Sequence, residues 1–135
     1  MRWWCDVAVG RCVVKPRIEA TQFGSITLGG VVYDHDVLVC PDARVKRRKK
    51  KLSKAVYGTS HRISLAEAKY VSGQGEGAER LIIGGGQYGR IELSPEAAGY
   101  LARKRCDVVL LPTPDVIVSW NEAKDKVIGL FHVTC

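Results

Sequence analysis

Residues 81–94 read "LIIGGGQYGRIELS" and join an apolar run to the start of a helix. The run at 80–83 is rich in Ile and Leu and does not alternate with polar residues, which is typical of a strand buried on both faces. Ser94 is a favourable helix N-cap, and Pro95 suits the first turn after it. The stretch predicts a strand, a glycine-rich connection and then a helix.

The same pattern repeats further along the chain. Apolar runs at 106–111 and 127–133 are rich in Val, Ile and Leu, and a second helix opened by Thr113 and Pro114 lies between them. Strands that alternate with helices indicate an α/β fold. The order β-α-β-α-β therefore predicts three buried strands in one sheet.

A β-hairpin is predicted ahead of this pattern. Residues 23–42, "FGSITLGGVVYDHDVLVCPD", alternate around Gly29-Gly30, which suits a turn that needs positive φ, with strands near 24–28 and 31–40. The predicted fold is a single three-layer α/β domain with an N-terminal β-hairpin followed by β-α-β-α-β.

A short helix is predicted between the hairpin and the first buried strand. Ser64 and Glu67 stand at the spacing of a capping box, in which the serine caps the helix and the glutamate reaches back to it. The segment 72–79, "SGQGEGAE", then predicts a polar loop.

Composition indicates an ordinary globular protein. The chain has 135 residues, 46% of them hydrophobic and 26% charged. The cysteines are odd in number and include no C-x-x-C, so we expect reduced thiols; they are Cys5, Cys12, Cys40, Cys106 and Cys135. No apolar run near the N-terminus reaches the ~20 residues of a membrane span. Together these features predict a cytoplasmic location.

The net charge of +7 comes from one segment. Eight of the 21 basic residues lie between Arg44 and Lys54 with no acid among them, which leaves 13 basic against 14 acidic residues elsewhere. A contact with a polyanion, either nucleic acid or an acidic membrane, would therefore use this segment. The candidate contact residues are Lys46, Arg47, Arg48, Lys49, Lys50 and Lys51.

The glycines of the opening stretch raise the question of a phosphate site. Gly84, Gly86 and Gly89 have the G-x-G-x-x-G spacing of a dinucleotide-binding turn, in which a helix begins at once and points its N-terminus at the anion. Here an alternating stretch, 90–93, intervenes, and the helix signal at Ser94 comes too late. The glycines predict a bend that shapes a cavity, and no cofactor is expected.

A loop at the carboxyl end of a strand in an open α/β sheet is where ligands usually bind. A small anion held by the glycine loop and Arg90 is therefore an alternative to a purely structural bend. Residues that would surround such a ligand are Gly84, Gly85, Gly86, Gly89, Arg90, Asp36, Asp42, His61 and Thr113.

Two clusters resemble catalytic or metal sites. Asp34, His35 and Asp36 contain ligand-type side chains, but on a strand the aspartates face one way and the histidine the other, so no metal site is predicted. His61 has the chemistry of a general base, yet no nucleophile motif accompanies it. His132 is expected to be buried. The sequence favours a non-catalytic function over an enzyme and assigns no catalytic residue.

Four quoted segments together resemble the Mth-type domains of unknown function. They are "YDHDVLVCPD" at 33–42, the glycine loop with "IELSPE", "WNEA" at 120–123 and "FHVTC" at 131–135. This family includes assembly factor three of mitochondrial complex I and an adipogenesis-associated domain protein. The likeness covers 23–135, which leaves 1–22 as an N-terminal extension.

The resemblance implies a central mixed sheet whose last strand runs antiparallel, and it implies no reaction. We therefore expect a non-catalytic binding or assembly module with an unidentified protein partner and a small-ligand pocket at the glycine loop. The alternatives are a small enzyme or carrier acting on an anionic small molecule at that loop, and a polyanion-binding protein using residues 44–54.

Overall fold

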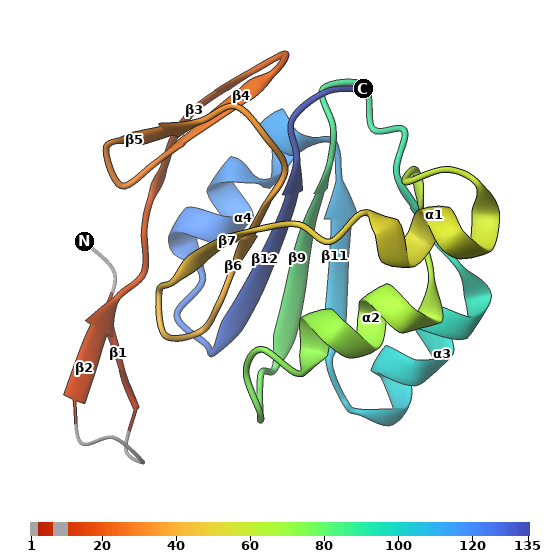
Figure 1. The fold of residues 1–135 in the computed structure, drawn as a ribbon. Helices are drawn as coiled ribbons and strands as arrows, with labels where there is room; N and C mark the ends of the chain where they lie inside the picture. The colour runs from red at the N-terminus through yellow and green to blue at the C-terminus, as the bar shows by residue number, and fades with distance from the viewer. Residues whose placement is uncertain (1–2, 7–10) are drawn as a thin grey trace.

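The computed structural model describes residues 3–6 and 11–135 (Figure 1). At its centre lies a mixed sheet with the strand order β11-β9-β12-β6-β7. Its strands are β6 Val37–Val39, β7 Val45–Arg47, β9 Arg80–Gly85, β11 Asp107–Leu111 and β12 Val127–His132. The three strands predicted from the apolar runs are β9, β11 and β12, and all three lie in this sheet.

The orientation of the strands explains why the sheet is mixed. β9 is parallel to β11 and to β12, whereas β12 is antiparallel to β6, and β6 is antiparallel to β7. The antiparallel relation expected of the last strand therefore holds toward β6, while toward β9 the last strand is parallel.

Helices cover one face of the central sheet. They are α2 Leu65–Ser72 and α3 Pro95–Arg103, and α1 Lys51–Tyr57 packs beside α2 (Figure 1). The buried side chains of α2 and α3, including Val71 and Leu101, pack against Leu81 and Ile83 of β9 and Leu130 of β12. This is the first of the two hydrophobic clusters that make up the described core.

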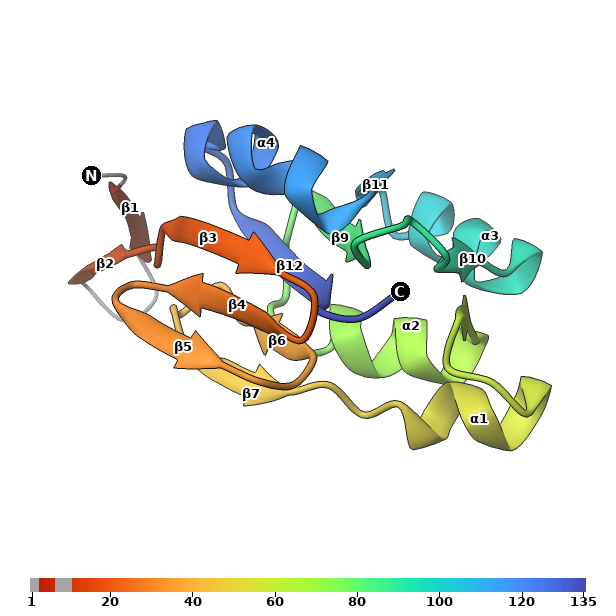
Figure 2. The ribbon, with the colours of Figure 1, turned by 90° about the horizontal axis from the view of Figure 1, so that it is seen from above.

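A second, three-stranded sheet and a helix cover the other face (Figure 2). The elements here are β3 Ile18–Gln22, β4 Ser25–Leu28, β5 Val31–Tyr33, the 3-10 helix η1 Thr113–Val116 and α4 Ile117–Glu122. Ile26, Trp120 and Phe131 are fully buried between them and the central sheet. With covers on both faces, the domain has three layers, as predicted.

The predicted hairpin is confirmed at its turn and corrected beyond it. Gly29 and Gly30 adopt φ of 55° and 83°, and β4 and β5 pair across them. The strand predicted over 31–40 is wrong in its length, because the chain turns at 34–36 and continues as β6 in the central sheet. Asp36, the last of the three polar residues at the break, belongs to the site described below.

Helix capping follows the sequence in two of three cases. The hydroxyl of Ser64 accepts the N–H of Glu67, and that of Ser94 accepts the N–H of Ala97. Thr113 does not cap a helix, since its hydroxyl is bonded elsewhere and the chain begins η1 instead.

Sequence reasoning missed several short elements. The described residues also include β1 Trp3–Asp6 and β2 Arg11–Val14, which pair antiparallel, and β8 Arg62–Ile63 and β10 Glu92–Leu93, which pair parallel. The basic segment forms β7 and α1. Ile18, assigned to the N-terminal extension, is 1% exposed and pairs with Leu28, so the packed structure begins before residue 23. In the described part of the chain no helix is long and apolar enough to cross a membrane.

Candidate functional site

Segments that are distant in the sequence meet at the carboxyl ends of β9 and β12. His132 is the last residue of β12, and Asp36 precedes β6, the antiparallel neighbour of β12. His61 lies in the turn before β8, and Cys135 follows β12. Figure 2 shows the segment after β12 lying between the glycine loop and the α1–α2 side of the domain. We call His61, His132 and Cys135 the imidazole–thiol cluster.

Asp36 fixes the orientation of His132. The Asp36 Oδ2 atom lies 2.6 Å from His132 Nδ1, and Oδ1 accepts the N–H of Val133 at 3.0 Å. Burial by itself would raise the pKa of Asp36, but the hydrogen bond and charge of His132, the Val133 N–H and the Arg48 guanidinium lower this pKa to about 2. Because an ionised carboxylate only accepts hydrogen bonds, Nδ1 of His132 carries the proton. In neutral His132 the lone pair is on Nε2, which lies 3.1 Å from the Thr134 hydroxyl.

Arg48 holds Asp36 from the other side. Its Nη1 donates to Asp36 Oδ2 at 3.0 Å, while Nε and Nη2 donate to the two carboxylate oxygens of Glu67 at 2.7 and 3.0 Å. Burial works to lower the pKa of Arg48, but the two carboxylates outweigh it and raise that pKa. Arg48 was predicted to be a polyanion contact, and this is wrong because its side chain is 1% exposed and paired.

The Glu67 carboxylate belongs to the same network and does not bind the backbone N–H at the start of α2. Its carboxylate accepts the hydroxyl of Ser53 at 2.5 Å in addition to Arg48, and the N–H of Ser64 donates to Ser53 Oγ at 3.0 Å. The serine half of the predicted capping box is therefore made, while Ser53 takes the role expected of Glu67. Sequence reasoning missed Glu67 as a support of the site.

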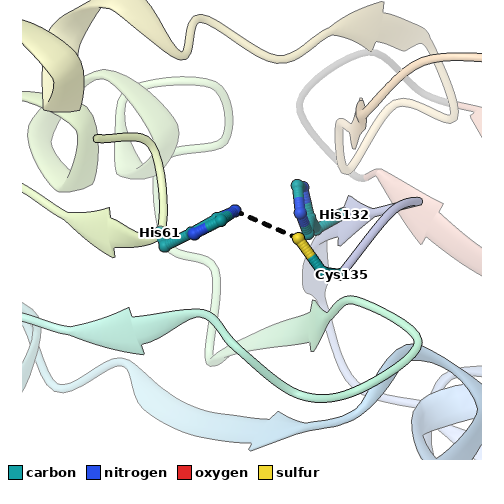
Figure 3. Close-up of side chains that lie close together, drawn as sticks. All are labelled: His61, His132 and Cys135. Carbon is teal, nitrogen blue, oxygen red and sulfur yellow. Dashed lines mark hydrogen bonds between the residues drawn. The ribbon is translucent and has the colours of Figure 1, made fainter.

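The three side chains of the imidazole–thiol cluster lie close together (Figure 3), and the Asp36–His132 contact joins them to this network. Nε2 of His61 is 3.4 Å from the Cys135 sulfur, and the two imidazole rings meet edge to face at 5.5 Å between centroids. Burial, followed by the positive charges of His132, Arg48 and Arg90, lowers the pKa of His61, with Asp36 opposing them. These surroundings therefore favour the neutral form of His61.

The glycine loop supports the segment that carries Cys135. Gly86 has a φ of 97°, and a Cβ atom there would lie 2.3 Å from the carbonyl carbon of Cys135. Gln87 donates its N–H to the Thr134 carbonyl at 2.7 Å, and Arg90 donates its N–H to the Cys135 carbonyl at 3.1 Å. These loop amides are used inside the protein, so they do not form the phosphate cradle of a dinucleotide-binding turn.

Two of the other three loop glycines, Gly84 and Gly89, are required for close packing. A Cβ at Gly84 would lie 2.8 Å from the Thr113 hydroxyl, and one at Gly85, the last residue of β9, would have ordinary contacts. Gly89 has a φ of 68° and would place a Cβ 2.9 Å from Pro112. The glycines thus build the bend, as the structural interpretation predicted, and offer no side chain to a ligand.

Thr113 and Asp42 differ in their relation to the site. Thr113 is fully buried, donates its hydroxyl to the His132 carbonyl at 2.7 Å and accepts the N–H of Gly86 at 2.9 Å. Asp42 lies beyond the opposite end of β6 and pairs with Arg44 near the surface. Asp36, His61 and Thr113 are thus brought together with the loop and Arg90, whereas Asp42 is not.

Other residues of the basic segment lie beside the polar network. Lys46 donates to Gln74 at 2.7 Å, and Lys49 lies 4.6 Å from the ring centre of Tyr70. A cleft of about 490 Å³ is lined by His35, Asp36, Arg47, Arg48, Lys49, Lys50 and Lys51. The polyanion contact stays a prediction for Lys46, Arg47, Lys49, Lys50 and Lys51.

Sequence reasoning did not assign His132 and Cys135 to the site. His132 was expected only to be buried, which its 2% exposure confirms. Both residues lie in "FHVTC". The resemblance of this segment to the family could have pointed to them, whereas no chemical pattern in the sequence did.

The fold and the site define a small mixed α/β domain with a buried ion-pair network beneath two histidines and a thiol. Residues 18–132 match a family model described as "Protein of unknown function (DUF498/DUF598)". The chain therefore belongs to this family, which confirms the predicted resemblance.

Solved structures support the assignment. A conserved hypothetical protein from Pyrococcus horikoshii is 32% identical with a TM-score of 0.75, and the match covers 88% of this chain and 99% of that one. A Mth938-like domain protein from Bordetella pertussis is 16% identical with a TM-score of 0.63, over 87% and 85% of the two chains, and shows the fold alone. Comparison with curated proteins found no match.

Proposed function

We propose that the domain is a binding module whose small-ligand site lies at the carboxyl end of the central sheet, between the imidazole–thiol cluster and Arg90. The observation that carries this proposal is the Asp36–His132 pair, which is 2.6 Å long and buried, and which leaves Nε2 of His132, beside the Thr134 hydroxyl, as the free ring nitrogen in the cluster with His61 and Cys135. Removing charged groups from water costs free energy that pairing offsets only in part, so the fold keeps this network at a cost in stability.

The side chains around the site suit a small anionic ligand. Arg90 is exposed, and its charge acts on His61. Within the described residues, the Gln87 amide nitrogen is the one buried side-chain nitrogen or oxygen with no hydrogen-bond partner, and Gln87 adjoins Thr134. Because the loop amides bond internally, these side chains rather than the backbone would contact a ligand.

The test is a titration of the full chain with inorganic phosphate, a nucleoside monophosphate and citrate, followed by amide NMR shifts. We expect at least one probe to shift the residues around His61 and Arg90 and to saturate. Arg90→Ala should weaken that probe at least about tenfold, whereas Arg103→Ala, at an exposed position on α3, should leave it unchanged. If no probe shifts these residues, the small-ligand function is excluded.

A second candidate function is recognition of a partner protein, as the assembly role of related proteins implies. It is favoured by β5, an edge strand of the three-stranded sheet whose Val31 and Val32 are 51% and 65% exposed. Exposed apolar edge strands pair readily with another chain, and a partner's extended strand is the occupant that fits this edge.

The partner is tested by comparing variants in native extract. The wild-type chain should recover a stoichiometric partner that Val32→Lys loses, while Val118→Lys, at a position on α4 that is 63% exposed, retains it. Recovery that is equal for all three chains would contradict strand pairing at β5.

A further inference from the structure

We propose that His61, His132 and Cys135 bind a zinc-class divalent transition metal ion. The inference rests on the proposed function, because it uses the same site, and it specifies the kind of ligand that this site binds. It also departs from the expectation of no metal, which was based on Asp34, His35 and Asp36 and on the spacing of the cysteines and did not consider His61 and His132 together with Cys135.

The spacing of the three side chains fits a single ion. One ligand atom from each residue lies within 4.8 Å of the others, and His61 Nε2 and Cys135 Sγ are 3.4 Å apart. In a tetrahedral zinc site the bonds are about 2.0–2.1 Å to nitrogen and about 2.3 Å to sulfur, which places the ligand atoms roughly 3.3–3.8 Å apart. The His61–Cys135 distance already has this value, and the widest gap needs to close by only about 1 Å.

His132 has the outer partner that metal-bound histidines usually have. Histidine ligands generally donate their second ring N–H to a carboxylate or carbonyl, which fixes the tautomer and makes the free nitrogen more basic. The Asp36 carboxylate, held by Arg48 and by the Val133 N–H, is placed 2.6 Å from Nδ1 of His132. Nε2 is therefore the ligand atom, and the Thr134 hydroxyl that contacts it would turn away.

The remaining groups agree with this assignment. Nε2 of His61 lies 3.4 Å from the Cys135 sulfur, and a ring nitrogen of a neutral imidazole is the group that binds metal. Cys135 would bind as a thiolate and pass its proton to solvent. His61 and Cys135 are half-buried next to the loop, so an ion has a route to the site.

The donor set selects the kind of metal. Two imidazole nitrogens and a thiolate suit Zn²⁺ and Co²⁺, whereas Mg²⁺ and Ca²⁺ need oxygen ligands, and the nearby Asp36 oxygens are occupied by Arg48, His132 and Val133. Three protein ligands leave the fourth tetrahedral position open, as in catalytic zinc sites. An anionic ligand beside Arg90 would occupy that position.

The experiment uses the full chain, reduced and freed of metal with EDTA. Titration with Zn²⁺ against a chromophoric chelator should show one ion per chain, and Co²⁺ should give a tetrahedral spectrum with a thiolate charge-transfer band. Cys135→Ser should remove that band, and Cys135→Ser and His61→Ala should each weaken Zn²⁺ binding at least about tenfold. Cys106→Ser is the matched control, because this buried cysteine lies at the far end of β11 and should change neither result.

A positioning role for Asp36 is tested separately. Asp36→Asn keeps the shape of the side chain and should weaken Zn²⁺ binding about 10–100-fold while the cobalt band remains. If this variant unfolds, His61→Ala and Cys135→Ser still decide the question, since both residues lie at half-buried positions outside the ion-pair network.

Three outcomes would overturn the metal site. They are no stoichiometric Zn²⁺ uptake, uptake unaffected by both ligand variants, and a cobalt spectrum without a thiolate band. If Zn²⁺ fails while phosphate or citrate still shifts the site in metal-free protein, the metal inference is wrong and the proposed function stands. If neither binds, both are wrong.

Discussion

The two ends of the central sheet use charge differently. At the carboxyl ends of β9 and β12, Arg48 forms ion pairs with Asp36 and Glu67, and all three side chains are 1% exposed. At the amino ends, Arg80 at the start of β9 pairs with Asp125 at 3.1 Å, but these side chains are 34% and 21% exposed. Solvent therefore screens one pair and is excluded from the other.

The buried charges position the side chains of the candidate site, whereas the exposed Arg80–Asp125 pair lies at the surface and positions no site residue. An exposed ion pair contributes about 0–1 kcal/mol, whereas removing one member of a buried pair leaves an uncompensated charge and costs about 3–5 kcal/mol. The buried pairs adjoin the imidazole–thiol cluster through the hydrogen bond between Asp36 and His132. They therefore restrict the orientation of the His132 ring.

The largest effect is expected from Arg48→Met. The substitution leaves the carboxylates of Asp36 and Glu67 buried without their cation, so the free energy of unfolding should fall by about 3–5 kcal/mol in urea denaturation. Arg47→Met, at the exposed neighbour, should change it by less than about 0.5 kcal/mol. Equal effects at the two positions would mean that burial does not distinguish them.

Glycine substitutions compare the two ends in a second way. Gly86, directly after β9, and Gly77, in the loop before β9, both have positive φ. Alanine in that conformation costs about 1–2 kcal/mol. At Gly86 the new Cβ would also collide with the Cys135 carbonyl, whereas at Gly77 nothing lies within 4 Å. We expect Gly86→Ala to cost about 2–4 kcal/mol and Gly77→Ala about 1–2 kcal/mol in thermal unfolding. A smaller cost at Gly86 would show that the C-terminal segment moves aside.

A modest effect is expected at the amino end. Asp125→Asn removes the charge that pairs with Arg80 and should lower the free energy of unfolding by about 0.2–1 kcal/mol, an effect that shrinks further as salt is added. Chemical denaturation at low and high ionic strength measures it. A loss above about 2 kcal/mol would contradict the screened character of this pair.

The smallest effect is expected from the paired change Lys50→Gln and Lys51→Gln. Both lie in the basic segment and line the cleft next to Arg48, but they take no part in the buried ion pairs. Stability should stay within about 0.5 kcal/mol of wild type. If the segment contacts a polyanion, DNA affinity should fall and depend less steeply on salt concentration. An unchanged salt dependence would remove these lysines from that contact.

Most of the framework could be predicted because its signals are local. The apolar runs of β9, β11 and β12, the caps at Ser64 and Ser94 and the Gly29-Gly30 turn each depend on residues a few positions apart. The length of the strand after this turn could not be predicted, because the break at 34–36 depends on Asp36 meeting His132, 96 residues away.

The site was only partly predictable for the same reason. Asp36, His61 and Thr113 were selected, and they do meet, but nothing local distinguishes Arg48 from the other cations of its run. The need for glycine at Gly86 depends on a segment near residue 135 that passes over the loop. Contacts of this kind appear only once the sheet order is known.

The place of β12 in the sheet has a consequence for synthesis on the ribosome. Because β12 lies between β9 and β6, a nascent chain that has emerged only as far as β11 holds two separate half-sheets, each with an open inner edge. The halves cannot be joined until residues 127–132 leave the exit tunnel, so completion of the domain waits for its last strand. Until then the exposed backbone at both edges is a target for chaperones and for mispairing between neighbouring chains.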